Sequence, residues 1–208
     1  MQQDVIVHIV DDDAAVRHSL EMLLKSVELK TKSYASAQAF LETVDSSTPG
    51  CLVLDIRMPD MSGLDLQQEL NHRRIDMPVI IITGHGDVPL TVRAMSEGAM
   101  TVLEKPYREQ TLLDNISKAV NCGMEAAKRN KARTAYFSRI NTLSPREQEV
   151  MDRLIIGKNS KEIASELNIS FKTVDVHRAH IMEKMQVRSL IELVHLTLQF
   201  RPELHNED

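Results

Sequence analysis

Short apolar runs alternate with helical patterns along the first half of the sequence, and this alternation restricts the fold more than any other feature. Each run is rich in valine, isoleucine and leucine, as expected for a parallel strand that is covered on both faces. The expected strands are Val5–Val10, Leu29–Ser33, Cys51–Leu54, Val79–Ile82 and Met100–Leu103. The expected helices are Ala14–Ser26, Ala37–Val44, Leu64–Arg73, Pro89–Glu97 and one from Glu109 onward. Five strands alternating with five helices predict an α/β fold built on a doubly wound, five-stranded parallel sheet.

The functional crevice of such a sheet lies outside the carboxyl ends of its strands. The first polar residues beyond those ends are Asp11, Asp12, Asp55, Thr83 and Lys105. Clustered carboxylates repel one another unless a cation lies among them, and a site made of oxygen ligands favours Mg²⁺. Asp55 ends the central apolar run, so it is the best candidate for a nucleophile that attacks a phosphoryl group. The ammonium of Lys105 and the hydroxyl of Thr83 are suited to contact the phosphoryl oxygens.

The second half of the chain predicts four short helices and no strand. The segment Leu143–Glu147 has Ser144 in the N-cap position, a proline next to it and Glu147 three residues after the cap, which together form a capping box. Further helices are expected to start at Ser160, Ser170 and Ser189. Because only a short turn separates the second of these four helices from the third, we expect a small all-α helix-turn-helix domain.

The helix expected from Ser170 to Met185 has two distinct faces on a 3.6-residue wheel. Val174 and Ile181 point inward together with Met185. The opposite face carries small and polar side chains, which let a helix approach the edges of DNA bases closely. The expected DNA-contacting residues are Lys172, Thr173, Asp175, Val176, Ala179 and His180.

The charge distribution indicates two domains with different partners. Residues 1–122 carry a net charge of −7, whereas residues 123–208 carry +2. Between the two halves, residues 124–139 are charged and rich in alanine and contain neither proline nor glycine, which favours a semi-rigid helical linker. We therefore expect one domain at 1–122, a helical linker at 123–140 and a second domain at 141–208.

What the sequence lacks narrows the class of protein further. Aromatic residues make up only 3% of the chain, which argues against a surface that binds single-stranded nucleic acid by stacking aromatic side chains on its bases. Cys51 and Cys122 are the only cysteines, which argues against a disulfide scaffold and against a zinc site. No apolar run approaches the roughly 18 residues that span a bilayer, and the N-terminus is unlike a secretory signal. These observations predict a cytoplasmic protein that makes no contact with a membrane.

The motifs of the first half together resemble those of bacterial receiver domains, over about residues 4–122. These motifs are Val10-Asp11-Asp12, the segment Asp55–Gly63, Thr83-Gly84 and Lys105-Pro106. The resemblance implies a flavodoxin-like receiver in which Asp55 accepts phosphate from a sensor histidine kinase. It also implies the roles of the other residues: Asp12, Asp55 and the backbone carbonyl of Arg57 hold Mg²⁺, Asp11 acts through metal-bound water, Lys105 and Thr83 contact the phosphoryl group, and the Lys105–Pro106 peptide is cis.

One position departs from the receiver pattern. Three residues before the lysine, most receivers carry a tyrosine or phenylalanine whose ring turns inward when the threonine moves toward the phosphate. This chain has Val102 there, so an aromatic switch is excluded. A movement of Thr83 is then expected to be transmitted through the helix at Pro89–Glu97 and the strand at Met100–Leu103.

The second half resembles the LuxR-type DNA-binding domain of the FixJ/NarL response regulators, over roughly residues 141–200. The matching motifs are Leu143–Glu147, Lys161–Ala164, Thr173-Val174 and Val176-His177. The resemblance implies a transcriptional regulator, an activator rather than an enzyme, that forms a homodimer when phosphorylated and binds double-stranded promoter DNA. RNA polymerase is a further expected partner.

Two other interpretations stay open at this point. The absence of an aromatic switch at Val102 is consistent with a regulator that binds DNA constitutively and has an atypical receiver. The spacing of Asp11 and Asp13 is also found in haloacid-dehalogenase-like phosphatases, whose nucleophile is an aspartate at a strand end. That second alternative lacks an acidic pair after Lys105, and it does not explain the helix-turn-helix half.

Overall fold

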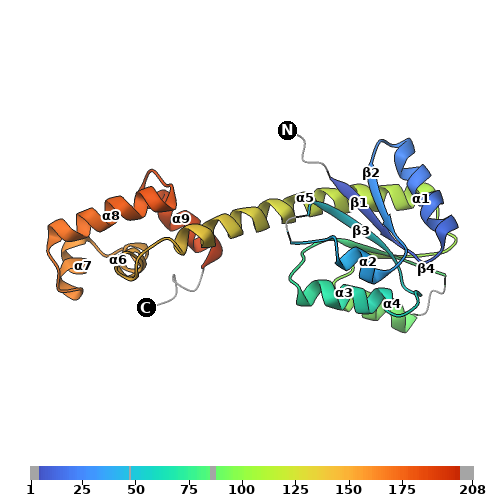
Figure 1. The fold of residues 1–208 in the computed structure, drawn as a ribbon, viewed down its shortest axis with the longest axis horizontal. Helices are drawn as coiled ribbons and strands as arrows, with labels where there is room; N and C mark the ends of the chain where they lie inside the picture. Colours follow the sequence, from blue (N-terminus) through green and yellow to red (C-terminus); the bar gives the residue numbers. More distant parts are fainter. Residues whose placement is uncertain (1–4, 47, 85–87, 202–208) are drawn as a thin grey trace. The chain divides into compact units, whose positions relative to one another are not determined.

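The computed structural model describes residues 5–46, 48–84 and 88–201 (Figure 1). Contacts within the chain divide it into two compact units, Met1–Asn130 and Lys131–Asp208. The long helix α5, Glu109–Ile140, begins in the first unit and ends in the second, and residues 124–139 of the expected linker lie within it. None of the helices in the described ranges combines the length and the apolar character that a bilayer-spanning helix needs.

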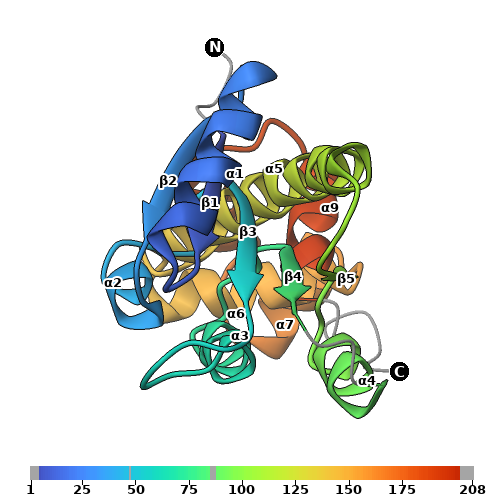
Figure 2. The ribbon, with the colours of Figure 1, turned by 90° about the vertical axis from the view of Figure 1, so that its right-hand side faces the viewer.

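The first unit contains a five-stranded parallel sheet with the strand order β2-β1-β3-β4-β5, as the alternating pattern predicts. The strands are β1 Ile6–Val10, β2 Lys30–Tyr34, β3 Gly50–Asp55, β4 Val79–Thr83 and β5 Thr101–Glu104. Figure 2 shows β3 at the centre of the sheet, between β1 and β4. The register sets Val10 beside Leu54 and Thr83 beside Glu104. The carboxyl ends of these strands therefore share one edge of the sheet.

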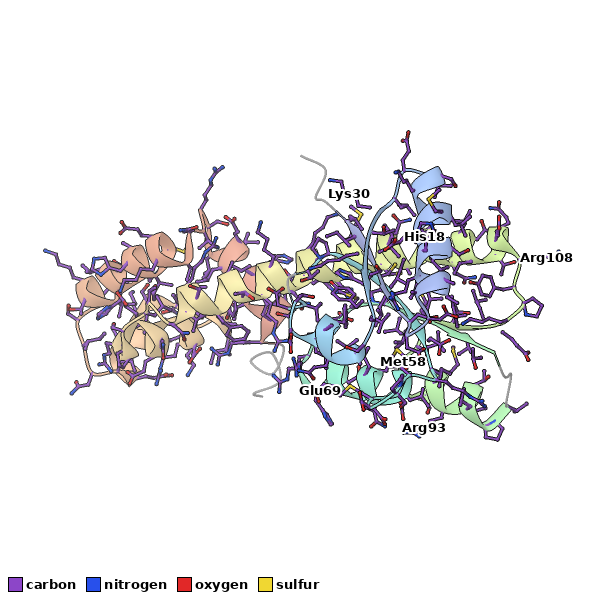
Figure 3. All side chains as sticks on the ribbon, turned by 45° about the vertical axis from the view of Figure 1, so that its right-hand side comes forward. His18, Lys30, Met58, Glu69, Arg93 and Arg108 are labelled. Carbon is purple, nitrogen blue, oxygen red and sulfur yellow. The ribbon has the colours of Figure 1, made fainter. Side chains whose placement is uncertain are left out.

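Helices cover both faces of this sheet, and alternate strand residues face the two layers. The helices α1, Ala14–Ser26, and α5 lie on one face, where Ile9 and Val53 are buried. The helices α2, α3 and α4 lie on the other face, over Leu52 and Leu54 (Figures 1 and 2). Their bounds are Ala37–Leu41, Gly63–His72 and Val88–Ser96. Accordingly, Glu69 of α3 and Arg93 of α4 lie on the opposite side of the sheet from His18 of α1 (Figure 3).

The helix α2 is shorter than expected. The sequence pattern predicts a helix to Val44, but α2 ends at Leu41. Thr43 explains the difference, because both its backbone N–H and its hydroxyl donate hydrogen bonds to the carbonyl of Phe40, each at 3.0 Å. The chain thus closes a tight turn there instead of continuing the helix.

In its described part, the second unit consists of the end of α5 and four further helices, as expected. These helices are α6 Pro145–Ile155, α7 Ser160–Glu166, α8 Phe171–Met185 and α9 Leu190–Phe200. Their core includes the fully buried side chains of Val150, Ile163, Val174 and Leu193. Tyr136 of α5 is buried in the same core, so the end of α5 is part of this unit.

Side-chain caps set the ends of these helices. Ser144 and Glu147 form the predicted capping box at the start of α6. The helix α7 starts at Ser160 as expected, with Asn159 as its N-cap, and it forms a capping box with Glu162. Asn168, with φ of 51°, takes the left-handed conformation in the turn between α7 and α8. This turn joins the two helices of the expected helix-turn-helix.

Candidate functional sites

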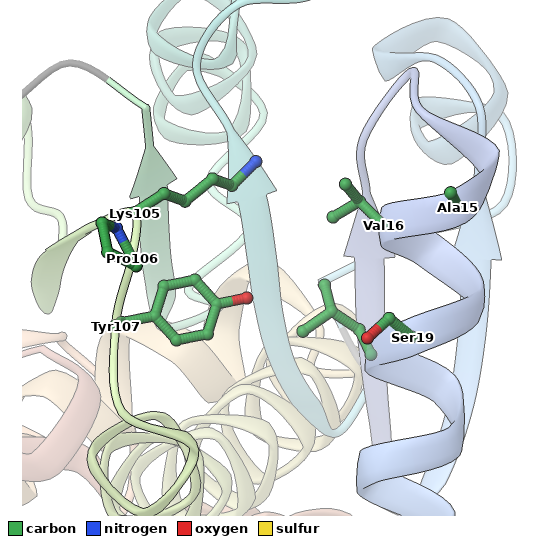
Figure 4. Close-up of a pocket in the computed structure, with 7 residues that line it drawn as sticks. Ala15, Val16, Ser19, Lys105, Pro106 and Tyr107 are labelled. Atoms are coloured by element: carbon green, nitrogen blue, oxygen red, sulfur yellow. The ribbon is translucent and has the colours of Figure 1, made fainter.

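The strand ends bring the predicted receiver residues together at one edge of the sheet. Asp11 directly follows β1, Asp55 ends β3, Thr83 ends β4 and Lys105 directly follows β5. The Nζ atom of Lys105 lies 2.9 Å from Oδ1 of Asp55 and 3.6 Å from Oδ2 of Asp11. In Figure 4 the ammonium of Lys105 reaches the tip of the central strand. Lys105 thus forms a polar cluster with two carboxylates that lie 50 or more positions before it in the chain.

The loop after β5 is tied to β4 at this edge. The backbone N–H of Lys105 donates a hydrogen bond of 2.8 Å to the carbonyl of Thr83, and the Thr83 side chain is buried next to it. The Lys105–Pro106 peptide is cis, in agreement with the receiver resemblance. This hydrogen bond links the position of the Thr83 backbone to that of Lys105.

The turn between β1 and α1 is held by its own hydrogen bonds. The backbone N–H of Asp13 donates to Oδ1 of Asp11 at 2.8 Å, and Asp13 in turn caps α1 by accepting from the N–H of Ala15. Arg17 donates from Nη1 to the backbone carbonyls of Asp11, at 2.7 Å, and of Asp12, at 3.0 Å. The exposed carboxylate of Asp12 has no hydrogen bond or ion pair with the described residues.

Sequence reasoning missed Arg17. The available signal was an arginine on the first turn of the helix that follows an acidic loop, but such a residue is usually a solvated surface cation. Asp13 has the role that its position predicts for a helix-start acid, because it serves as the N-cap of α1.

Burial and the neighbouring charges shift the pKa values of Asp11 and Lys105. Burial raises the pKa of Asp11, and the nearby carboxylates of Asp55 and Asp12 raise it further, against the opposing effects of the Asp13 N–H and of Lys105. Burial also acts to lower the pKa of Lys105, but the hydrogen bond and negative charge of Asp55 and the charge of Asp11 outweigh burial and raise it. Two carboxylates therefore share the ammonium of Lys105, and the nearby carboxylate of Asp12 leaves the cluster with an excess of negative charge.

This donor set fits a hard divalent cation. Within the described residues, no three side chains of His, Cys, Asp and Glu are close enough together to form a metal site by themselves. Mg²⁺ does not require three, because it binds one or two protein carboxylates and keeps several of its waters. Asp12 offers an unpaired carboxylate, and the backbone N–H of Arg57 donates to Oδ2 of Asp55 at 2.7 Å, which orients that carboxylate from the loop side.

The loop after Asp55 is packed directly against the start of α3. The N–H of Gly63 donates to the carbonyl of Ile56 at 2.9 Å, and Ser62 caps α3 through a box with Asp65. A Cβ atom at Gly63 would lie 2.3 Å from the carbonyl oxygen of Asp55. Only glycine permits this approach, so the start of α3 supports the main chain of Asp55.

A cavity of about 410 Å³ opens beside the cluster. It is lined by Ala15, Val16, Ser19 and Leu20 of α1 and by Lys105, Pro106 and Tyr107 of the loop after β5 (Figure 4). The ring of Tyr107 points across the cavity toward α1 in Figure 4. The cavity therefore lies between α1 and the loop that carries Lys105.

Val102 lies in the middle of β5, beside Ile81 of β4. Its side chain is half-buried and packs against the core layer that contains α4. A branched aliphatic side chain in this position has no ring to swing between an outward and an inward rotamer. The absence of an aromatic switch stays a prediction from the identity of this residue.

The predicted faces of α8 are confirmed. Val174, Ile181 and Met185 are fully buried. All six expected DNA-contacting side chains are exposed: Lys172, Thr173, Asp175, Val176, Ala179 and His180. Arg178 of the same helix makes no ion pair with the described residues, and its Nη1 donates to the Ser160 hydroxyl at 2.7 Å. The result is an exposed face of small and polar side chains on the second helix of a helix-turn-helix.

Sequence families match both units. Residues 7–117 match the response regulator receiver domain, and residues 141–197 match the family described as bacterial regulatory proteins, luxR family. The transcriptional regulatory protein FixJ of Azorhizobium caulinodans is 44% identical over 198 residues, which cover 95% of this chain and 94% of that protein. The transcriptional regulatory protein TdiR of Thauera aromatica is 41% identical over 193 residues, covering 93% of this chain and 85% of TdiR.

Solved structures show the same similarity over both units. The response regulator StyR matches with a TM-score of 0.79 and 43% identity, over 92% of this chain and 97% of StyR. Full-length FixJ from B. japonicum matches with a TM-score of 0.55 and 41% identity, over 94% of this chain and 97% of the FixJ chain. The two halves of the sequence thus occur together, in the same order, in proteins described as response regulators.

Proposed function

This chain belongs to the response regulators that join a receiver domain to a LuxR-type DNA-binding domain, and from this we propose that it regulates transcription under the control of phosphorylation at Asp55. The observation that carries the proposal is the ammonium of Lys105, 2.9 Å from Asp55 and 3.6 Å from Asp11. An ordinary surface ion pair joins one cation to one carboxylate and does not require several strands. Here the ends of three strands bring together a nucleophile, a second carboxylate and a cation, which is the arrangement that phosphoryl transfer needs.

In the proposed reaction, a carboxylate oxygen of Asp55 attacks the phosphorus of a phosphohistidine on a sensor kinase. The new P–O bond forms as the P–N bond breaks, and the electron pair of that bond returns to the imidazole. Lys105 then exchanges part of its contact with Asp55 for a contact with a phosphoryl oxygen, and the hydroxyl of Thr83 donates to another.

Asp12, Asp55 and the backbone carbonyl of Arg57 would hold Mg²⁺, with Asp11 acting through a bound water. When bound, Mg²⁺ would offset the negative charge that the carboxylates and the phosphoryl group bring together. The excess of negative charge in the cluster and the unpaired carboxylate of Asp12 support this assignment.

We propose that a movement of Thr83 is transmitted to β5 and α4 without the help of an aromatic side chain. The hydrogen bond between Thr83 and the backbone of Lys105 couples β4 to the loop after β5. Val102 contacts the core layer that also includes Ala94 of α4. A shift of Thr83 toward the phosphoryl group would change the packing of this layer and so favour a homodimer.

The paired DNA-binding units would then insert α8 into the major groove of promoter DNA. The exposed face of α8 carries Lys172 near its start, where it can contact a phosphate, and the small side chains of Val176 and Ala179, which allow close approach to base edges. Thr173, Asp175 and His180 flank this contact. We propose activation rather than repression, with RNA polymerase as the further partner, on the strength of the family.

Two variants that differ by the same chemical change test the role of Asp55. Wild type, Asp55→Asn and Asp60→Asn are incubated with acetyl phosphate and Mg²⁺, and phosphate incorporation and molar mass are measured by mass spectrometry and light scattering. Asp60 is an exposed residue of the same loop, and asparagine tolerates its left-handed φ of 66°. We expect one phosphate and a dimer mass for wild type and for Asp60→Asn, and neither for Asp55→Asn.

Other results would favour the alternatives. A wild-type mass that is dimeric with or without phosphate would favour a constitutive regulator, the alternative that Val102 motivates. Sustained hydrolysis of p-nitrophenyl phosphate that needs Asp11 and is indifferent to Asp55 would favour a phosphatase.

A further inference from the structure

Arg17 contacts the acidic turn in a way that the proposed phosphorylation chemistry does not use. It lies at the end of the first turn of α1, where its side chain is half-buried. A single guanidinium nitrogen, Nη1, donates to two consecutive backbone carbonyls, at 2.7 Å to Asp11 and at 3.0 Å to Asp12. No hydrogen bond in the described residues joins Arg17 to a carboxylate, so its contact with the turn is through the main chain.

The two bonds fix the direction of the chain at the end of β1. In a strand, the carbonyls of consecutive residues point to opposite sides, so two of them reach one donor only where the backbone turns. Asp11 and Asp12 are the first residues after β1, and the chain bends there. Both carbonyls are therefore directed toward α1, and this orientation of the main chain determines where the two side chains leave it.

The remaining polar groups of the turn complete this arrangement. The Asp11 carboxylate is held by the Asp13 N–H at 2.8 Å and faces Lys105, whereas the Asp12 carboxylate has no partner among the described residues. The orientation of Asp12 therefore depends on its backbone, and Arg17 is the side chain that holds this backbone.

We propose that Arg17 is a positioning residue for the cation site, acting through the main chain of Asp11 and Asp12. This inference rests on the proposed function, in which Asp12 and Asp55 hold Mg²⁺. Arginine suits the role because its planar fork presents fixed donors, whereas lysine offers a mobile point charge. Groups that orient the ligands of a metal typically contribute 10- to 100-fold to metal affinity.

The sign of the effect separates positioning from simple electrostatics. A positive side chain close to a cation site repels the cation, so a purely electrostatic role predicts that removing Arg17 tightens Mg²⁺ binding. A role limited to stabilising α1 predicts a lower melting temperature with unchanged Mg²⁺ affinity. Of the three roles, only the positioning role predicts that Arg17→Ala stays folded and binds Mg²⁺ more weakly than wild type.

Calorimetric titration of the full chain with MgCl₂ tests the proposal without any phosphorylation step. We expect Arg17→Ala to weaken Mg²⁺ binding by about tenfold or more, and Arg17→Lys, which keeps the charge but carries its donors on a mobile ammonium, to weaken it by less. Lys25→Ala removes the same charge from an exposed position in the last turn of α1 and should bind Mg²⁺ as wild type does. Circular dichroism at the titration temperature establishes that each variant is folded.

Mg²⁺ affinity in Arg17→Ala that equals or exceeds that of wild type would overturn the proposal. If Arg17→Ala does not fold, Arg17→Lys provides the test. Mg²⁺ affinity equal to that of wild type in this folded variant would contradict the need for a planar guanidinium group at position 17. If the wild-type chain binds no Mg²⁺, both the cation site and this inference are refuted. If wild type binds Mg²⁺ and Arg17→Ala binds it equally well, only the inference is refuted.

Discussion

Glu147 is ionised although it is almost completely buried in the DNA-binding unit. Burial by itself raises the pKa of this carboxyl group, but the hydrogen bond from Lys184, at 2.6 Å, and the N–H of Ser144, at 2.7 Å, outweigh it and lower the pKa to about 2. The same side chain therefore closes the capping box of α6 and ties α6 to α8. The helix α8, which we propose faces DNA, is thus joined to α6 by an ion pair on its other side.

This linkage predicts an acid-sensitive second unit. In the unfolded chain the pKa of Glu147 returns to its ordinary value of 4.5, so the carboxylate contributes its full stability above that pH. The contribution is lost as the pH falls from about 4.5 to about 2, by roughly 3 kcal/mol in total. Urea unfolding between pH 5 and pH 2.5, followed by the NMR signals of α6 and α8, measures it.

Glu147→Gln should be less stable than wild type at pH 5, and the difference should shrink toward pH 2.5. Glu149→Gln is the matched control, since Glu149 is exposed on the same helix and its ion pair among the described residues is with the exposed Arg146. If the free energy of unfolding of Glu147→Gln differs from that of wild type by the same amount at every pH, the assignment of the ion pair is contradicted.

Lys172 carries a prediction about how α8 binds DNA. A lysine that contacts a phosphate adds to affinity without adding to sequence preference, and its loss reduces the dependence of binding on salt. We expect Lys172→Ala to weaken binding to all sequences alike and to lower the slope of log K against log salt by about 1 per bound chain. Fluorescence anisotropy at several salt concentrations measures this, and Lys128→Ala, which removes an exposed lysine of α5, should leave the slope unchanged.

At the scale of an element, α5 contains a glycine that helix propensity would disfavour. Gly123 lies in the interior of α5, where glycine costs about 1 kcal/mol relative to alanine. A Cβ atom at Gly123 would, however, lie 1.8 Å from the backbone oxygen of Gly50 at the start of β3. The close contact between α5 and the sheet therefore requires this glycine.

Gly123→Ala should accordingly destabilise the receiver, by about 1–3 kcal/mol as for other overpacked cores, rather than stabilise it. Asn121→Ala at an exposed position of the same helix should stabilise it by a few tenths of a kcal/mol, because alanine is the better helix former. Thermal unfolding of the two variants gives the sign. A gain in melting temperature for Gly123→Ala would show that α5 does not pack against β3 as described.

The elements that were predicted correctly depend on local sequence. The apolar runs give all five strands to within one or two residues, and Ser62, Ser144 and Ser170 cap the expected helices, because a cap needs only a side chain and the nearby backbone. The same holds for the edge of the sheet: once five strands are parallel, Asp55 and Lys105 must lie at their common end.

Long-range contacts between residues explain what the sequence did not predict. The carbonyl contacts of Arg17 depend on how the chain bends after β1, and nothing in its neighbours distinguishes it from a surface arginine. The partner of Glu147, Lys184, is 37 residues away. The approach of Gly123 to Gly50 depends on where a helix crosses a strand, which no periodicity encodes.

At the scale of the whole molecule, the charges limit how phosphorylation can act. A phosphoryl group adds about −1.5 to −2 charges, and it would join a half of the chain that already carries −7. Phosphorylation therefore cannot raise DNA affinity by attraction between the receiver and DNA. In the function we propose, it acts by changing how chains associate, and two copies of α8 would then read half-sites about one helical turn, roughly 34 Å, apart.

The most direct test of this account measures DNA affinity with and without a mimic of the phosphoryl group. A DNA site selected for binding to the beryllofluoride form is titrated, by fluorescence anisotropy, with wild type and with Asp55→Asn, each with and without beryllofluoride and Mg²⁺. We predict that beryllofluoride raises the affinity of wild type at least tenfold, with a steeper concentration dependence, and does not change that of Asp55→Asn. Equal affinity of wild type in both states would contradict control by Asp55 and leave a protein that binds DNA regardless of its receiver.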